Sequence, residues 1–195
     1  EAKDLYVELY NQSALNRQDE SYLIPYNIAY CFFRNGDYKS AEKWFHTYLD
    51  GSVVKYRKDA LERIGDCAFV AKAYGKAGAS YDLVLRDFFD VNDVYPYYQS
   101  AISHGLAGNQ DKKMKLLSNL LAASPASPFY PEALFELGRS YVVKEDDENA
   151  FKCFNQLAET TTDTTYIAKA YIEMGSLSRN SSQFNEALEY YKAVV

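Results

Sequence analysis

A small residue recurs along the chain at nearly constant spacing, and this recurrence limits the fold more than any other sequence feature. At steps of 36, 36, 37 and 37 residues, the positions are Ala29, Gly65, Ala101, Gly138 and Gly175. Twelve residues after each lie Ala41, Ala77, Lys113, Ala150 and Ala187, and four residues further lie Phe45, Tyr81, Leu117, Phe154 and Tyr191. A period of this length is typical of helical-repeat arrays, in which each small unit packs only on its neighbours.

Each repeat reads as two short helices, most clearly between residues 131 and 157. Apolar or small residues at the helical spacings i, i+3, i+4 and i+7 predict one buried face on each helix: Leu134, Leu137, Gly138 and Tyr141, then Ala150, Phe154 and Leu157. The polar sequence KEDDE between them predicts a turn. Pro131 suits the first turn of a helix, where its missing N–H costs nothing. We therefore expect pairs of antiparallel helices that approach closely at the small residues.

This pattern resembles the tetratricopeptide repeat, with a large residue, Leu, Gly and Tyr followed by Ala, Phe and Ala; Leu157 stands where the family usually has the last Ala. The resemblance covers nearly the whole chain. It implies an all-α solenoid of antiparallel helix pairs, wound as a right-handed superhelix, in a single domain over residues 1–195. The expected parts are the second helix of a truncated repeat at 1–12 and five repeats at 22–50, 58–91, 94–123, 131–160 and 168–195. Because the chain opens and ends within apparent helices, we expect a fragment of a longer protein.

Three local features carry specific expectations. Lys113 occupies a position where alanine is expected, and we expect its stem to lie along the surface with its ammonium in water. Thr164 or Thr165 is the expected N-cap of the helix that follows. The last helix is expected to expose an apolar edge through which copies of the fragment self-associate, formed by Tyr191, Val194 and Val195.

Composition excludes several classes of partner. A net charge of −6 argues against binding to nucleic acid or to anionic membrane surfaces. No apolar run approaches the roughly 18 residues of a membrane-spanning helix. The chain has three cysteines, and we expect Cys31, Cys67 and Cys153 to be free thiols, because equivalent positions in stacked helices lie about 10 Å apart.

We find no pattern of catalytic or metal-binding residues. His46 and His104 are isolated, and we interpret each as a surface or packing histidine. CxxC, HExxH, GxSxG and phosphate-loop motifs do not occur. The acidic pair Asp146-Asp147 falls in a predicted turn, where carboxylates cap helices. We therefore predict a protein without catalytic residues, metal or cofactor.

The resemblance places a partner-binding surface on the first helix of each repeat, at positions two, five, nine and twelve, which line a concave groove in the family. Carried over to this chain, the expected partner-binding residues are Tyr26, Tyr30, Phe33, Asp59, Glu62, Asp66, Phe69, Tyr98, Phe135 and Arg139. If they are exposed, five of the rings form an aromatic wall: Tyr26, Tyr30, Phe33, Phe69 and Tyr98. The three carboxylates form an acidic stripe, which favours a partner with basic residues. Core packing of the rings and simple solvation of the carboxylates explain both patterns as well.

The function implied is a non-catalytic scaffold that binds a protein or peptide segment in its groove. Alternatives are a structural or assembly subunit of a bacterial envelope complex, an auxiliary domain of a larger enzyme or sensor, and glycan binding by the aromatic wall. The stretch from Ser124 to Val142 is similar to joints between repeats in bacterial envelope proteins, such as the outer-membrane assembly lipoproteins. This similarity favours the bacterial periplasm or cell envelope over the cytoplasm.

Overall fold

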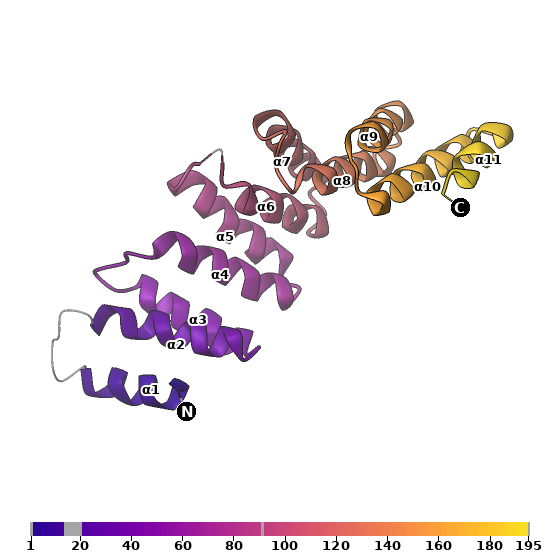
Figure 1. Ribbon diagram of the computed structural model, residues 1–195. Coiled ribbons are helices and arrows are strands. Elements are labelled where there is room, and N and C mark those ends of the chain that lie inside the picture. The colour runs from indigo at the N-terminus through magenta and orange to yellow at the C-terminus, as the bar shows by residue number, and fades with distance from the viewer. Residues whose placement is uncertain (1, 14–20, 91, 195) are drawn as a thin grey trace. The chain divides into compact units, whose positions relative to one another are not determined.

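The computed structural model describes residues 2–13, 21–90 and 92–194, and every regular element within these ranges is helical (Figure 1). The helices are α1 (Ala2–Ser13), η1 (Ser21–Leu23), α2 (Ile24–Arg34), α3 (Tyr38–Leu49), α4 (Arg57–Val70), α5 (Tyr74–Asp87), α6 (Val94–Leu106), α7 (Gln110–Ala123), α8 (Tyr130–Val143), α9 (Asp147–Thr160), α10 (Thr164–Asn180) and α11 (Phe184–Lys192). The predicted all-α class is confirmed. We call α2, α4, α6, α8 and α10 the first helices, and α3, α5, α7, α9 and α11 the second helices.

The helices form two compact units, and the division between them falls inside α6. Unit 1 comprises Glu1–Asp90 with Ile102–Ala107, and unit 2 comprises Val91–Ala101 with Gly108–Val195. In unit 1, helices α1 to α5 pack each on the next along the chain. In unit 2, helices α7 to α11 do the same, and α10 also packs on α8. The single domain expected over residues 1–195 stays a prediction.

The turns inside the helix pairs share one backbone conformation. Each contains a residue with a positive φ between 57° and 89°, at Gly36, Lys72, Gly108, Glu145 and Ser182. The N–H that follows it reaches back to the preceding helix, as from Asp37 to the carbonyl of Phe32 at 3.0 Å and from Asp146 to that of Tyr141 at 3.0 Å. This is the Schellman arrangement, which satisfies carbonyl groups left over at a helix end.

The residue after each positive φ also begins the next helix. Asp37, Asn109 and Asp146 accept the backbone N–H three residues ahead, at 3.1, 3.1 and 3.2 Å. At Ala73 and Gln183, no side-chain cap is formed. One residue thus closes the first helix and opens the second, which keeps the turn short.

The N-cap of α10 differs from the prediction. Asp163 accepts the N–H of Thr165 at 2.8 Å, and Thr164 is the first helical residue. The prediction of Thr164 or Thr165 was wrong because a carboxylate one residue earlier is available for the same N–H. A carboxylate also interacts more favourably with the positive end of a helix than a hydroxyl does.

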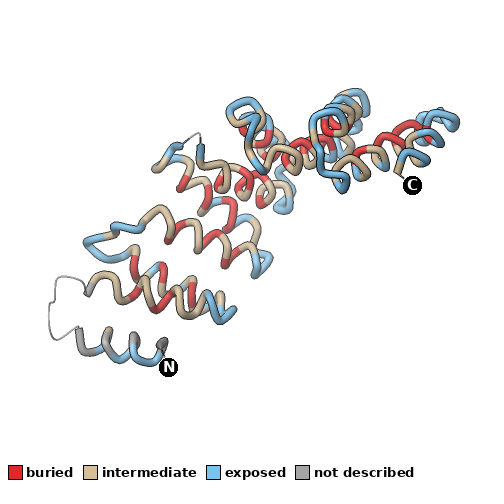
Figure 2. The backbone as a smooth tube through the Cα atoms, viewed as in Figure 1, coloured by how far each residue is buried: buried red, intermediate tan, exposed pale blue. Residues whose placement is uncertain are grey.

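In three of the pairs, the core forms where a glycine of the first helix meets a ring of the second. A Cβ built on Gly65, Gly138 or Gly175 would lie 2.6–2.7 Å from a ring carbon of Tyr81, Phe154 or Tyr191. Tyr81 and Phe154 are fully buried, as are Ala41, Ala77 and Ala150 on the second helices. Figure 2 shows buried stretches recurring along the helices between intermediate and exposed ones. At these three positions the glycine is therefore required by direct contact between an aromatic ring and the helix backbone.

Lys113 is buried, contrary to the prediction. Lys113 as a whole is 8% exposed, and its Nζ donates to Oε2 of Glu136 on α8 at 2.6 Å. Its position is an interior one, which fully buried alanines hold at residues 41, 77 and 150. The ammonium therefore needs a carboxylate partner from the next repeat, because a buried charge without one is strongly destabilising.

The last helix exposes apolar side chains, and of the residues expected there Tyr191 and Val194 are half-buried. Tyr191 is half-buried because its ring lies over Gly175, whereas Phe184 and Leu188 are the exposed large apolar residues of α11. Val195 lies outside the described residues. Self-association of the chain stays a prediction.

Replacing Gly138 by alanine is expected to lower the free energy of unfolding by up to about 2 kcal/mol. The overpacking cost of about 1–3 kcal/mol outweighs the gain in helix propensity of about 1 kcal/mol. Gly75→Ala on α5 is the matched control, since a Cβ there meets nothing within 4 Å. Urea unfolding followed by circular dichroism measures both variants, and equal stabilisation of the two would contradict the packing role.

Ala73→Asp is expected to raise the free energy of unfolding by about 0.5–1 kcal/mol, because it supplies α5 with the side-chain cap that α3, α7 and α9 have. Asp146→Ala is expected to lower it by a similar amount. The same unfolding measurement tests both, and no change on adding the aspartate would show that the cap is without effect at this turn.

Candidate functional site

The residues predicted to bind a partner fall into two groups, one in each unit. In unit 1, helices α2 and α4 carry Tyr26, Tyr30, Phe33, Asp59, Glu62, Asp66 and Phe69. In unit 2, helices α6 and α8 carry Tyr98, Phe135 and Arg139. The structure therefore divides the predicted residues into two sets, one in each unit, and each set has its own contacts.

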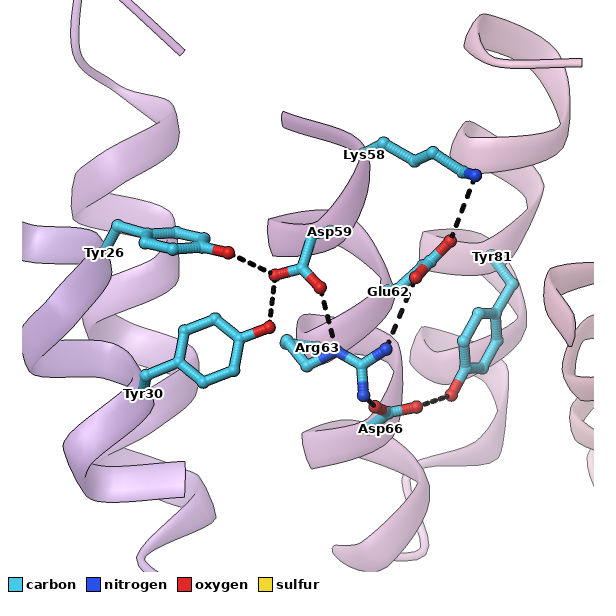
Figure 3. A network of polar contacts seen from close by, with 8 residues as sticks. All are labelled: Tyr26, Tyr30, Lys58, Asp59, Glu62, Arg63, Asp66 and Tyr81. Carbon is cyan, nitrogen blue, oxygen red and sulfur yellow. Dashed lines mark hydrogen bonds and ion pairs between the residues drawn. The ribbon is translucent and has the colours of Figure 1, made fainter. Parts of the chain in front are cut away.

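Tyrosines of α2 bind a carboxylate of α4. The hydroxyl groups of Tyr26 and Tyr30 both donate to Oδ2 of Asp59, at 2.8 and 2.5 Å (Figure 3). The two rings lie one turn apart on α2 and meet edge to face with centroids 5.0 Å apart. This contact joins the first helices of two successive repeats, so these three residues serve the fold as well as any ligand.

Arg63 lies among the three carboxylates of α4, and the sequence reasoning missed it. Its Nη1 donates to Oδ2 of Asp66, its Nη2 lies 3.3 Å from Oε2 of Glu62, and its Nε lies 3.6 Å from Oδ1 of Asp59. Lys58 lies 4.0 Å from Glu62 (Figure 3). The signal was available, because Asp59 and Asp66 stand at i−4 and i+3 from Arg63.

The acidic stripe is therefore largely neutralised within α4. Its three carboxylates face two cations, which leaves a net charge of −1. Asp66 also accepts the hydroxyl of the buried Tyr81 at 2.5 Å, and its side chain is 13% exposed. A basic partner is thus no longer needed to explain three like charges on one helix, and the sequence-based reason for expecting one is removed.

Burial and the nearby carboxylate hold both tyrosines of α2 in the neutral form. Burial, and then the hydrogen bond to Asp59, raise the pKa of Tyr26 well above its ordinary value. The same two causes raise the pKa of Tyr30 to about 12. A phenolate at either position would face the charge of Asp59 and lose the hydrogen bond that it now donates.

Phe33 and Phe69 lie 36 residues apart, in the last turns of α2 and α4. Both are half-buried. The ring of Phe33 lies 5.8 Å from the guanidinium carbon of Arg63 and 5.4 Å from the ring centre of Tyr38. The ring of Phe69 lies 5.4 Å from that of Tyr74. These rings keep part of their surface open, as the predicted binding role requires.

Tyr98 does not present an exposed aromatic face, contrary to the expectation. It is 7% exposed, and its ring stacks on that of Phe129, with centroids 5.1 Å apart and planes inclined by 28°. Burial, and then a hydrogen bond to Glu132, raise its pKa. The sequence did not reveal this contact because Phe129 lies in the proline-rich joint between α7 and α8, which is outside the repeat pattern.

In unit 2 we call one set of residues the α8–α10 face. It consists of Phe135 and Arg139 on α8 and of Tyr166, Lys169 and Ile172 on α10. The Nζ of Lys169 lies 5.6 Å from the ring centre of Phe135 and 4.6 Å from that of Tyr166. The side chain of Arg139 is 57% exposed, and its Nη1 lies 3.6 Å from Oε1 of Glu136. Ile172 is 46% exposed. Of the residues on this face, the sequence predicted Phe135 and Arg139.

The remaining nucleophiles and metal-ligand types are dispersed. Across the described ranges, no group of three or more His, Cys, Asp or Glu side chains is placed to hold a metal ion. The cysteines are free, and burial raises the pKa of Cys67 to about 12 and that of Cys153 to about 11. His46 is exposed, and Nε2 of His104 lies 3.0 Å from Oδ2 of Asp82. None of the helices that the structure describes has the length and apolar character needed to span a bilayer.

The stability of the chain is expected to fall at alkaline pH through the tyrosines of α2. Because the folded-state pKa values of Tyr26 and Tyr30 are raised, their contribution is complete below about pH 10 and is lost as the pH rises toward 12. Tyr30→Phe should flatten the decline of the free energy of unfolding between pH 9 and 11, roughly the range in which ordinary phenols ionise. Equal slopes in the wild-type chain and the Tyr30→Phe variant would contradict the assignment.

Comparisons with known proteins agree with this geometry. The family model for the tetratricopeptide repeat matches residues 132–160, which hold most of α8 and all of α9. No curated protein matches the chain.

Three solved structures show the likeness in fold. MamA (residues 41 to end) from Desulfovibrio magneticus RS-1 is 18% identical over 90% of this chain and 93% of that one, with a TM-score of 0.73. YrrB, described as a TPR protein with an unusual peptide-binding site, is 16% identical over 97% and 90%, with a TM-score of 0.70. The C-terminal part of a TPR repeat-containing protein from Cytophaga hutchinsonii is 18% identical over 98% and 72%, with a TM-score of 0.74. The resemblance seen in the sequence is confirmed, and the chain has the tetratricopeptide-repeat fold.

Proposed function

We propose that this chain is a non-catalytic scaffold that binds a segment of a partner protein across the faces of its first helices. The observation that carries the proposal is the α8–α10 face, where Lys169 lies over the ring of Phe135 and where Arg139, Lys169 and Ile172 are exposed. Packing of the repeats does not require these residue types to be exposed. Apolar and cationic side chains side by side are common at protein interfaces.

The chemistry of the other reactive groups supports a binding role. A thiol with a raised pKa is a poor nucleophile, and this applies to both Cys67 and Cys153. The carboxylates of α4 are held by Arg63, Lys58 and tyrosine hydroxyls, so they serve as structural partners. These groups stabilise the fold, so the exposed surfaces of the first helices remain for contact with a partner.

The similar structures support the same class of function. One of them, YrrB, is described as having a peptide-binding site, on a chain that this protein matches over 97% of its own length. At 16% identity this likeness concerns the fold. It supports the view that an array of this size offers enough surface for a peptide.

A single site of this kind is expected to bind with a dissociation constant of about 1 μM, equivalent to about −8 kcal/mol. We expect a random twelve-residue peptide display library to yield binders to the whole chain. Hydrogen exchange of the complexes should then show added protection in first helices such as α4, α8 or α10. Protection confined to the second helices α3, α9 and α11 would contradict binding on the first-helix faces, and a library without any binder would contradict the function.

A further inference from the structure

We propose that the outer side of α11 binds an amphipathic helix of a partner protein. The residues concerned are Ala187, Leu188 and Tyr191 on α11 and Val194 just after it, and we call them the α11 face. This inference goes beyond the proposed function, because it concerns a second helix and not the faces of the first helices. It concerns unit 2 alone.

In the other repeats, the equivalent face of the second helix is covered by the next first helix. Helices α4, α8 and α10 pack on α3, α7 and α9. One apolar cluster of unit 1 joins three residues of α3 to three of α4: Ala41, Phe45 and Tyr48, and Ala60, Ile64 and Cys67. By repeat position, the three residues of α3 correspond to Ala187, Tyr191 and Val194. The α11 face thus consists of positions at which a second helix contacts its next neighbour.

Two of these positions are buried throughout the preceding helix pairs. The residues equivalent to Tyr191 and Val194 are at most 3% exposed there: Phe45, Tyr81, Leu117 and Phe154, and Tyr48, Val84, Leu120 and Leu157. Tyr191 and Val194 themselves are half-buried. In the described part of the chain, no first helix follows α11. Covering this apolar surface with a helix would therefore be favourable.

Leu188 lies on the same side of α11 and is 50% exposed. Its equivalent in α9 is Phe151, whose ring centre lies 5.9 Å from that of Tyr190 in the next repeat. The position of Ala187 is held in α7 by Lys113, which contacts Glu136 of the next repeat at 2.6 Å. Both positions therefore face the following repeat, and a helix bound to the α11 face would cover Leu188.

The charged residues of α11 already have partners on the same helix. The Nζ of Lys192 lies 3.0 Å from Oε1 of Glu189, and Glu186 accepts the hydroxyl of Tyr190 at 3.3 Å. Apolar contact, and not charge, therefore decides which helix fits the α11 face.

The helices that cover this face in other repeats share a spacing of buried residues. An alanine is followed four residues later by a large aliphatic residue, and three residues after that by a small or apolar one. The sets are Ala60, Ile64 and Cys67 on α4, Ala133, Leu137 and Ser140 on α8, and Ala170, Met174 and Leu177 on α10. Residues at these spacings share one side of a helix. We expect the partner helix to carry the same pattern.

A second copy of the chain fits the α11 face less well than a different protein does. The helices with this pattern are already packed, because α4, α8 and α10 lie on the second helices that precede them. Helix α2 packs on α1, and α6 contacts α5 through His104 and Asp82 at 3.0 Å. A second copy would have to unpack one of its own repeats, whereas a partner can supply a free helix.

The test uses a labelled peptide of residues 163–181, which contains α10 and its capping residues. This peptide is chosen because α9, which α10 covers, resembles α11 at the four positions, with Ala150, Phe151, Phe154 and Leu157. In fluorescence polarisation the peptide should bind the whole chain saturably. Its affinity should fall at least tenfold in Leu188→Glu. The matched control Val143→Glu changes an exposed apolar residue on α8 and should stay within twofold.

A second measurement keeps the chain unchanged and so does not depend on the folding of a variant. The peptide with Met174→Glu should not bind, and added sodium chloride should not weaken binding of the original peptide. Hydrogen exchange should show added protection in α11.

Four results would overturn the proposal: no saturable binding, equal binding of the two peptides, unchanged affinity in Leu188→Glu, or protection in α9, where the peptide would have replaced α10. Light scattering that shows a dimer lost in Leu188→Glu, without any peptide, would also overturn it, in favour of a second copy. These results do not concern the first-helix faces, so they leave the scaffold function standing.

Discussion

The structure depends on a contact between a helix backbone and an aromatic ring. In three of the repeats, a glycine of the first helix leaves room for the ring of Tyr81, Phe154 or Tyr191 on the second helix. These short helices are marginal in isolation, so they are stable only when packed on a partner. Any larger residue at the glycine would separate the pair and weaken the apolar contacts around it. The 36- and 37-residue spacing of the small residues reflects this contact repeated along the chain.

The fold was largely predictable from the sequence because it depends on local spacing. The small residues, the apolar faces and the polar segment at residues 144–148 are enough to place the helix pairs. Errors arose where a residue from another repeat, or from a joint, decides the outcome. Lys113 is buried because α8 supplies Glu136, and Tyr98 is covered because the proline-rich joint supplies Phe129. Neither partner follows from the period.

The candidate site was less predictable than the fold, for the same physical reason. A stripe of like residue types on one helix face does not show which of them are satisfied by neighbours. Asp59 binds two tyrosine hydroxyls and Asp66 binds Arg63 and Tyr81, so charges that seemed free to meet a partner are held within the chain. Lys169 was not among the predicted partner-binding residues, although its ammonium lies over the ring of Phe135. Surface chemistry is thus set by contacts between helices, which the repeat pattern leaves undefined.

The buried pair of Lys113 and Glu136 makes the order of the repeats matter. The position of Glu136 is held by Arg63 in α4, so a shuffled chain that placed α7 before α4 would set an ammonium against a guanidinium in the interior. Repeats that look alike in outline are therefore not exchangeable modules. Because a buried charge is strongly destabilising without its partner, the pair specifies which repeat can follow α7. It thereby disfavours recombination or slippage between neighbouring repeats.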